Sequence, residues 1–155
     1  MEKNIIISQH PSSYLSMTIL KNNEKFNNDR IAIFNTSSLL NFVIDYKNIY
    51  YFTIYTIINN KKYYLNFKSL IDNNYDLCYC SLTNDKSKAD SFVLQNNDLL
   101  YLIKNENDIV PLSFYELHVH ENNNCYSVNV LLCTSKNINE ISNIKLIDVN
   151  HYELL

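Results

Sequence analysis

The chain has 155 residues, of which 13 are basic and 16 acidic, giving a net charge of −3 at neutral pH. This length suits one domain with a hydrophobic core, and the lack of a basic block disfavours DNA or RNA as a partner. Glycine is absent, which excludes the glycine-dependent phosphate-binding and dinucleotide-binding loops and the Gly-x-Ser-x-Gly nucleophile elbow. We expect a single folded domain that is not an enzyme and needs no cofactor.

The predicted elements are all strands. Short runs rich in β-branched and aromatic residues recur about every ten residues, separated by clusters of Asn, Asp, Ser or Lys. No segment repeats apolar residues at helical spacing for long enough to predict a helix. In chain order, strands are predicted at 4–8, 13–19, 30–34, 40–45, 49–57, 62–68, 76–82, 91–95, 99–105, 114–120, 125–132 and 143–149.

Asparagine pairs separate many of these runs. A chain without glycine needs another residue where the backbone has a positive φ, and asparagine tolerates that conformation best among the rest. We therefore predict turns at Asn22-Asn23, Asn27-Asn28, Asn59-Asn60, Asn73-Asn74, Asn96-Asn97 and Asn122 to Asn124.

Several apolar positions recur at intervals of about 50 residues, which indicates an internal repeat. A second set, later in each unit, recurs at steps of 50 and 52 residues. The first sets are Tyr14, Tyr64 and Phe114; Leu15, Leu65 and Tyr115; and Met17, Phe67 and Leu117, and the second set is Phe42, Phe92 and Ile144.

Three units of four strands, at about 1–48, 49–97 and 98–155, resemble a β-trefoil. The resemblance implies a six-stranded barrel, filled by inward-facing side chains, and three hairpins that cap one end. The final segment, HYELL, would lie beside NIIIS and close the barrel. A β-sandwich is the alternative all-β fold, and it predicts no threefold spacing.

Within the trefoils, the pattern is similar to that of ricin B-type lectins, whose repeats carry Gln-x-Trp in the last strand. The matching triplets here are Leu40-Asn41-Phe42, Asp90-Ser91-Phe92 and Ser142-Asn143-Ile144, so Phe or Ile replaces Trp. The resemblance covers the whole chain in architecture. It implies a non-catalytic recognition domain that binds carbohydrate.

The same resemblance suggests where a ligand would bind. These lectins hold galactose-type sugars with an Asp on the second strand of a repeat, and Ser16, Asn66 and Glu116 occupy that place here. In the second repeat, Asn66, Tyr79 and Asn84 would supply amides and an aromatic platform for a sugar. We predict Asn66, Tyr79, Asn84 and Glu116 as ligand-binding residues; the alternative is that Tyr79 packs in the interior and the two asparagines are solvated.

Other β-trefoils bind proteins instead of sugars, including cytokine-like, actin-binding and inhibitor-like members. The 13 tyrosines favour such a role, because tyrosine provides contact area at low entropic cost. The expected partner is therefore a carbohydrate or a protein, bound by a monomer.

Two histidines form a possible metal-binding pair. His118 and His120 lie two residues apart on a predicted strand, so both side chains face the same side. Two imidazoles with a nearby carboxylate can bind zinc or copper, but exposure to solvent is the simpler interpretation, and we predict no metal. His10 and His151 would approach each other if the barrel closes as expected.

The four cysteines are expected to be free, buried thiols. Cys78 and Cys80 alternate along one strand and point to one face, so they cannot readily bridge each other. Cys125 and Cys133 lie eight residues apart, and the paired CxxC spacing of structural zinc sites is missing.

The N-terminal residues MEKNIIISQHPSS lack the apolar core and cleavage site of a signal peptide. No apolar run approaches the length of a membrane span. As written, the chain is expected to be soluble and cytoplasmic, although removal of a natural leader would make it a secreted protein.

Overall fold

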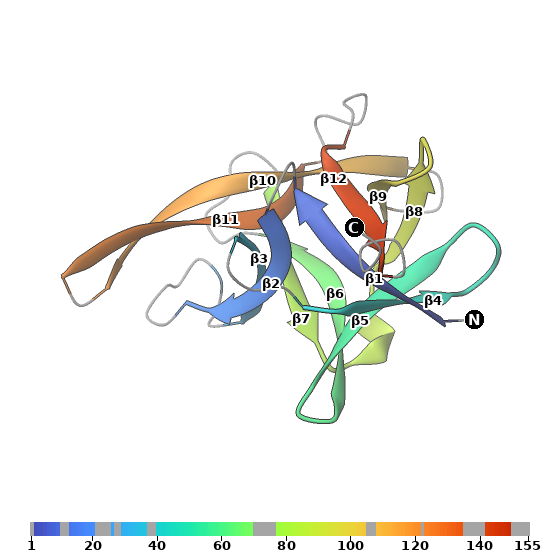
Figure 1. The fold of residues 1–155 in the computed structure, drawn as a ribbon, viewed down its shortest axis with the longest axis horizontal. Helices are drawn as coiled ribbons and strands as arrows, with labels where there is room; N and C mark the ends of the chain where they lie inside the picture. The colour runs from blue at the N-terminus through green and yellow to red at the C-terminus, as the bar shows by residue number, and fades with distance from the viewer. Residues whose placement is uncertain are drawn as a thin grey trace.

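The protein is built from antiparallel strands (Figure 1). The computed structural model describes residues 2–9, 13–20, 26, 29–36, 40–69, 77–104, 108–121, 123–134 and 142–149. A one-turn 3-10 helix at Lys86–Lys88 precedes β8. The strands are β1 (Glu2–Gln9), β2 (Ser13–Ile19), β3 (Arg30–Asn35), β4 (Phe42–Tyr46), β5 (Phe52–Ile58), β6 (Lys61–Ser69), β7 (Leu77–Thr83), β8 (Ser91–Gln95), β9 (Leu99–Lys104), β10 (Asp108–Glu121), β11 (Asn124–Thr134) and β12 (Ile144–Asp148).

All twelve predicted strands are present, so the prediction of an all-β protein is confirmed. The largest difference in length is β10, which begins at Asp108, six residues before the predicted start. In that added segment Pro111 pairs with Tyr101 of β9, which places a proline inside a strand.

Six of the strands close into a ring. β1 pairs with β4 and β12, β5 pairs with β4 and β8, and β9 pairs with β8 and β12. Every pairing is antiparallel, and the ring leaves none of these six strands as a free edge.

Three hairpins, β2–β3, β6–β7 and β10–β11, extend from the ring. Their second strands pair with one another, because β3, β7 and β11 each contact the other two. The third hairpin is much longer than the others and projects from the body of the protein (Figure 1). We call residues 115–121 and 123–129 of this hairpin the arm.

The predicted architecture is corrected by this arrangement. The sequence predicted a β-trefoil of three equivalent four-stranded repeats, whereas the structure is a closed antiparallel β-barrel whose twelve strands belong to one sheet. The hairpin strands are also unequal: β10 and β11 have 14 and 11 residues, but β2 and β3 have 7 and 6. The positions that matched at intervals of about 50 residues share only an apolar character. Such spacing does not require the strands of each unit to have equal lengths.

The predicted register illustrates the error. Leu15 and Leu65 are fully buried, but their predicted counterpart Tyr115 is 49% exposed on the arm. The later set is more uniform, because Phe42, Phe92 and Ile144 are each fully buried. The matched positions are therefore buried alike in the barrel, whereas on the arm Leu117 is buried and Tyr115 is exposed.

Asparagine takes the place of glycine in the turns, as predicted. The described residues with positive φ are all asparagines: Asn59, Asn60, Asn96, Asn97 and Asn123. Asn59 and Asn60 join β5 to β6 with positive φ at both positions, which is the geometry of a type I′ hairpin turn. The pairs at 22–23, 27–28 and 73–74, and Asn122 of the last predicted turn, lie outside the described residues.

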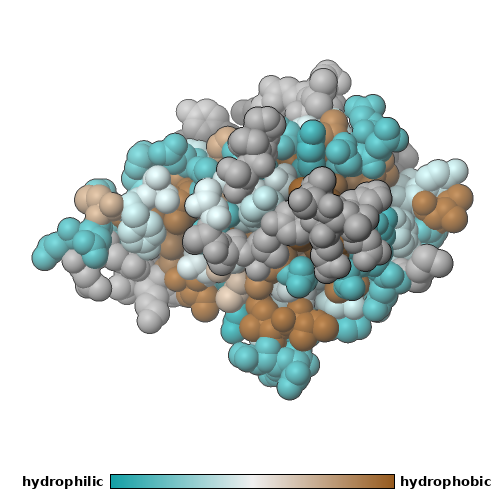
Figure 2. Space-filling model, viewed as in Figure 1, coloured by the Kyte–Doolittle hydropathy of each residue, from teal (hydrophilic) through white to brown (hydrophobic). Residues whose placement is uncertain are grey.

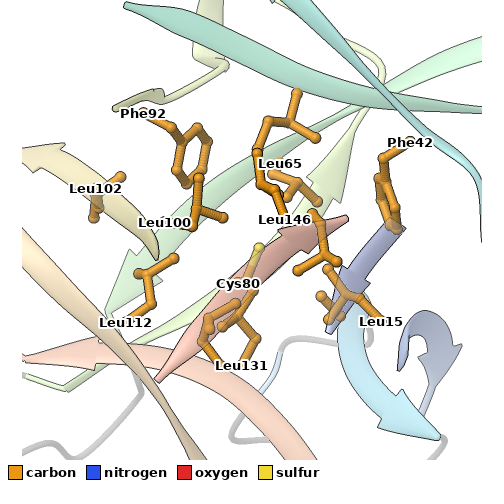
Figure 3. Close-up of a cluster of buried hydrophobic side chains, with 14 of the residues drawn as sticks. Leu15, Phe42, Leu65, Cys80, Phe92, Leu100, Leu102, Leu112, Leu131 and Leu146 are labelled. Atoms are coloured by element: carbon orange, nitrogen blue, oxygen red, sulfur yellow. The ribbon is translucent and has the colours of Figure 1, made fainter. Parts of the chain in front are cut away.

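The interior has two hydrophobic clusters. The larger fills the barrel, where residues from many strands converge (Figure 3). The smaller lies beneath the arm and contains Leu20, Phe26, Ile31, Ile33, Tyr79, Leu117, Val119 and Val130.

No helix in the described part of the chain is long and apolar enough to cross a membrane. The HYELL segment and the pair His10 and His151 lie outside the described residues. At the C-terminal side, β12 is the strand that pairs with β1, with Ile6 opposite Ile147.

Candidate functional site

A groove opens where the arm separates from β3. The two strands pair only at Val130 with Ile33 and Asn129 with Phe34. At the next positions β3 and β11 diverge, and the gap between them is a groove of about 510 Å³. The length of β10 and β11 creates this site, because a shorter hairpin would end before the groove.

The groove is lined mainly by neutral polar side chains. Ile33, Phe34 and Val128 supply its apolar part, and the only charged lining residue among the described ones is Glu116. The polar lining residues come from β2, the end of β3 and the arm: Ser13, Thr18, Asn35, Thr36, Glu116, Tyr126, Ser127 and Asn129.

Two arm residues give the groove its distinctive chemistry. The side chain of Glu116 is 58% exposed, and its Oε1 lies 3.7 Å from Nε2 of His118. Tyr126 is 41% exposed, so a large part of its surface is open to solvent. A carboxylate accepts hydrogen bonds, and a phenol ring offers both an apolar face and a polar hydroxyl.

Of the predicted ligand-binding residues, only Glu116 lines the groove. Asn66 is buried in β6, where its Oδ1 accepts a hydrogen bond of 2.6 Å from the Ser81 hydroxyl. Asn84 lies exposed in the bend that follows β7. The sequence missed Asn35, although a polar residue at the end of an apolar strand was a signal for it.

Tyr79 is a packing residue in the structure. It is fully buried, and its ring contacts Phe26 edge to face with ring centroids 5.0 Å apart. Its hydroxyl donates a hydrogen bond of 2.8 Å to Oδ2 of Asp29, which also lies 3.1 Å from Nζ of Lys68. A ring with no exposed surface cannot stack on a sugar, so the interior role matches the alternative interpretation of Tyr79.

The far end of the arm holds a cysteine and a histidine in contact. Nδ1 of His120 lies 2.9 Å from Sγ of Cys125, directly across the hairpin. His118 lines the same exposed surface. Within the described ranges, no three His, Cys, Asp or Glu side chains are grouped to hold a metal ion.

Figure 2 shows the arm end, at the left of the view, covered mainly by hydrophilic and weakly hydrophobic residues.

Three of the cysteines, Cys78, Cys80 and Cys133, are free and buried as predicted. Cys125 is free but exposed, so the prediction of burial is wrong for this residue. The long hairpin carries it away from the barrel.

Comparison with known proteins finds no matching family model, no similar curated protein and no similar solved structure.

Proposed function

We propose that the protein is a non-catalytic recognition module that binds a neutral carbohydrate in the groove between β3 and the arm. The observation that carries this proposal is the lining itself, which combines hydroxyls and amides from two separate hairpins with one carboxylate and one exposed tyrosine. A sugar presents many hydroxyl groups, which need both donors and acceptors, together with an apolar ring face that an aromatic side chain covers.

The size and charge of the groove agree with this ligand class. Its volume of about 510 Å³ lies within the usual range for small-molecule sites. Glu116 would accept hydrogen bonds from adjacent hydroxyls, while Asn35 and Asn129 would donate and accept from opposite walls. An anionic ligand would meet the carboxylate of Glu116, and none of the described lining residues is cationic, so a neutral sugar is favoured.

The test is a glycan array followed by calorimetric titration of the best free sugar. Tyr126→Ala is expected to weaken binding roughly tenfold because it removes the stacking surface. Glu116→Gln is expected to weaken it by a similar or larger factor, since a hydrogen bond to a charged group is lost.

Tyr115→Ala is the matched control, because Tyr115 is another exposed arm tyrosine that does not line the groove. It is expected to bind the sugar as the unmodified protein does. Equal losses in Tyr115→Ala and Tyr126→Ala, or no glycan bound at all, would contradict the carbohydrate proposal.

A second candidate is recognition of another protein by the arm. Tyr115 and Tyr126 are exposed by 49% and 41% on one projecting hairpin, and tyrosines are enriched in protein interfaces. In that case a protein would be captured in the presence of excess free sugar. Tyr115→Ala would then reduce capture, which distinguishes this candidate from the first.

A further inference from the structure

Two buried cysteines face each other at one end of the barrel, away from the groove lining. Cys78 of β7 is the direct antiparallel partner of Cys133 of β11. Opposed residues in such a pair have Cα atoms about 4.5–5.5 Å apart, which lies inside the range of about 4.4–6.8 Å that disulfides require. The backbone is therefore already placed for a bond between the two sulfurs.

The surroundings give the two sulfurs different properties. Cys78 is 9% exposed and Cys133 only 1%. Nζ of Lys104, at the end of β9, lies 3.9 Å from Sγ of Cys78. A hydrogen bond from the Cys133 thiol and the ammonium of Lys104 lower the pKa of Cys78 to about 6, against the opposing effect of burial.

The pKa values of the other two buried cysteines shift in the direction opposite to that of Cys78. The hydrogen bond to Cys78, together with burial, raises the pKa of Cys133. Burial also raises the pKa of Cys80, two residues along β7. Ser69 donates a hydrogen bond that favours the Cys78 thiolate, whereas the carboxyl group of Asp90 disfavours it. Cys78 is thus the sulfur best suited to attack, and Cys133 is the neighbouring protonated thiol.

We propose that Cys78 and Cys133 form a peroxide-reactive dithiol site, with Cys78 as the attacking sulfur, Cys133 as the resolving sulfur and Lys104 as the cation that positions the thiolate. The pairing across β7 and β11, the contact with Lys104 and the narrow exposure of Cys78 together select a small, neutral oxidant such as hydrogen peroxide.

The chemistry balances in two steps. The Cys78 thiolate attacks one peroxide oxygen, the O–O bond breaks, and hydroxide leaves, so that Cys78 becomes a sulfenic acid. The sulfur of Cys133 then attacks Sγ of Cys78, and the proton of Cys133 leaves with the sulfenic hydroxyl as water. The dithiol is oxidised by two electrons to a disulfide, and the peroxide is reduced to two molecules of water once the hydroxide has taken up a proton.

The test uses Cys125→Ser protein, so that the exposed thiol does not compete. Reduced protein is treated with an equimolar amount of peroxide, denatured, alkylated and mapped by tandem mass spectrometry. Cys78 and Cys133 are expected to lose alkylation together and to appear as one linked peptide, while Cys80 stays alkylated. Dithiothreitol is expected to reverse the change.

Matched variants separate the roles. Cys133→Ser is expected to stop the reaction at a sulfenic acid on Cys78, which dimedone traps. Lys104→Met is expected to slow oxidation at neutral pH. The rate for the parent protein should change little between pH 7 and pH 8, whereas an ordinary thiol would react roughly eightfold faster at the higher pH.

A Cys78 that stays fully alkylated after peroxide treatment would overturn the proposal, and so would a disulfide between Cys78 and Cys80. An eightfold rise in rate between the two pH values would refute the role of the activated thiolate.

Discussion

At the scale of single residues, asparagine occupies the turn positions with positive φ that glycine usually occupies. Asn60 has φ of 66° in the two-residue turn between β5 and β6. A left-handed backbone costs roughly 1–2 kcal/mol for most L-residues but little for glycine. Asn60→Ala is expected to lower the free energy of unfolding by about 1 kcal/mol, and Asn60→Gly to leave it unchanged or raise it slightly.

Urea unfolding of the two Asn60 variants measures this difference. Asn48 stabilises its turn in a different way from Asn60. Its side-chain Oδ1 accepts hydrogen bonds from the backbone N–H groups of Tyr50 and Tyr51. An Asn60→Ala protein as stable as the Asn60→Gly protein would contradict the role assigned to the positive φ.

A second residue-scale prediction concerns Asp90. Burial raises the pKa of this carboxyl group above its ordinary value of 3.8, although its Oδ2 accepts a hydrogen bond of 2.6 Å from the N–H of Phe67. The folded state therefore holds the proton more tightly than the unfolded state, and stability is lost as the pH rises through the folded pKa. Asp90→Asn is expected to lack this loss, so its advantage should be larger at pH 7 than at pH 3.

Asp85 serves as the control, because its effect on stability changes with pH in the opposite direction to that of Asp90. Hydrogen bonds from Ser87 lower the pKa of Asp85, so its contribution is present at neutral pH and lost as the pH falls. Asp85→Asn should therefore be less stable than the parent at pH 7, with a smaller difference in acid. Urea titrations of the parent and both variants at the two pH values would refute the account if the advantage of Asp90→Asn over the parent were smaller at pH 7 than at pH 3.

At the scale of elements, the arm is held by one face and exposed on the other. Leu117 and Val119 are each only 8% exposed, because they pack on the smaller cluster with Val130. Leu117→Ala is expected to cost about 2–3 kcal/mol, the lower part of the range for buried leucines. Tyr115 lies on the same side of β10 as Leu117 but is 49% exposed, so Tyr115→Ala is expected to change stability by less than about 0.5 kcal/mol.

Hydrogen exchange provides the sharper measurement for the arm. Leu117→Ala should accelerate amide exchange in the arm more than in β5, whose five leading residues are buried. Uniform acceleration through the whole chain would show that the arm does not move as a separate unit.

Sequence reasoning succeeded for single elements and failed where distant strands meet. The twelve strands follow from β-branched and aromatic runs between asparagine turns. The groove was missed because Asn35 and Tyr126 meet only through the pairing of β3 with β11. The facing of Cys78 and Cys133 was missed for the same reason. Glu116 was predicted from its position in the lectin-like repeat, whereas in the structure it lines the groove because it lies on the arm.

At the scale of the whole molecule, the hairpins extend from the closed ring, and the longest hairpin carries the proposed binding groove. The barrel buries Phe42, Phe92 and Ile144 completely, so the arm projects from a well-packed core. The two proposed sites are chemically separate, since none of the cysteines Cys78, Cys80 and Cys133 lines the groove.

The most direct test of the proposed function is an NMR titration of isotope-labelled protein with the sugar selected by the glycan array. The account predicts that the largest amide shift changes fall on Asn35, Thr36, Glu116, Tyr126 and Asn129, on both walls of the groove. Changes concentrated around Asn66 and Asn84, with the groove residues unaffected, would contradict it.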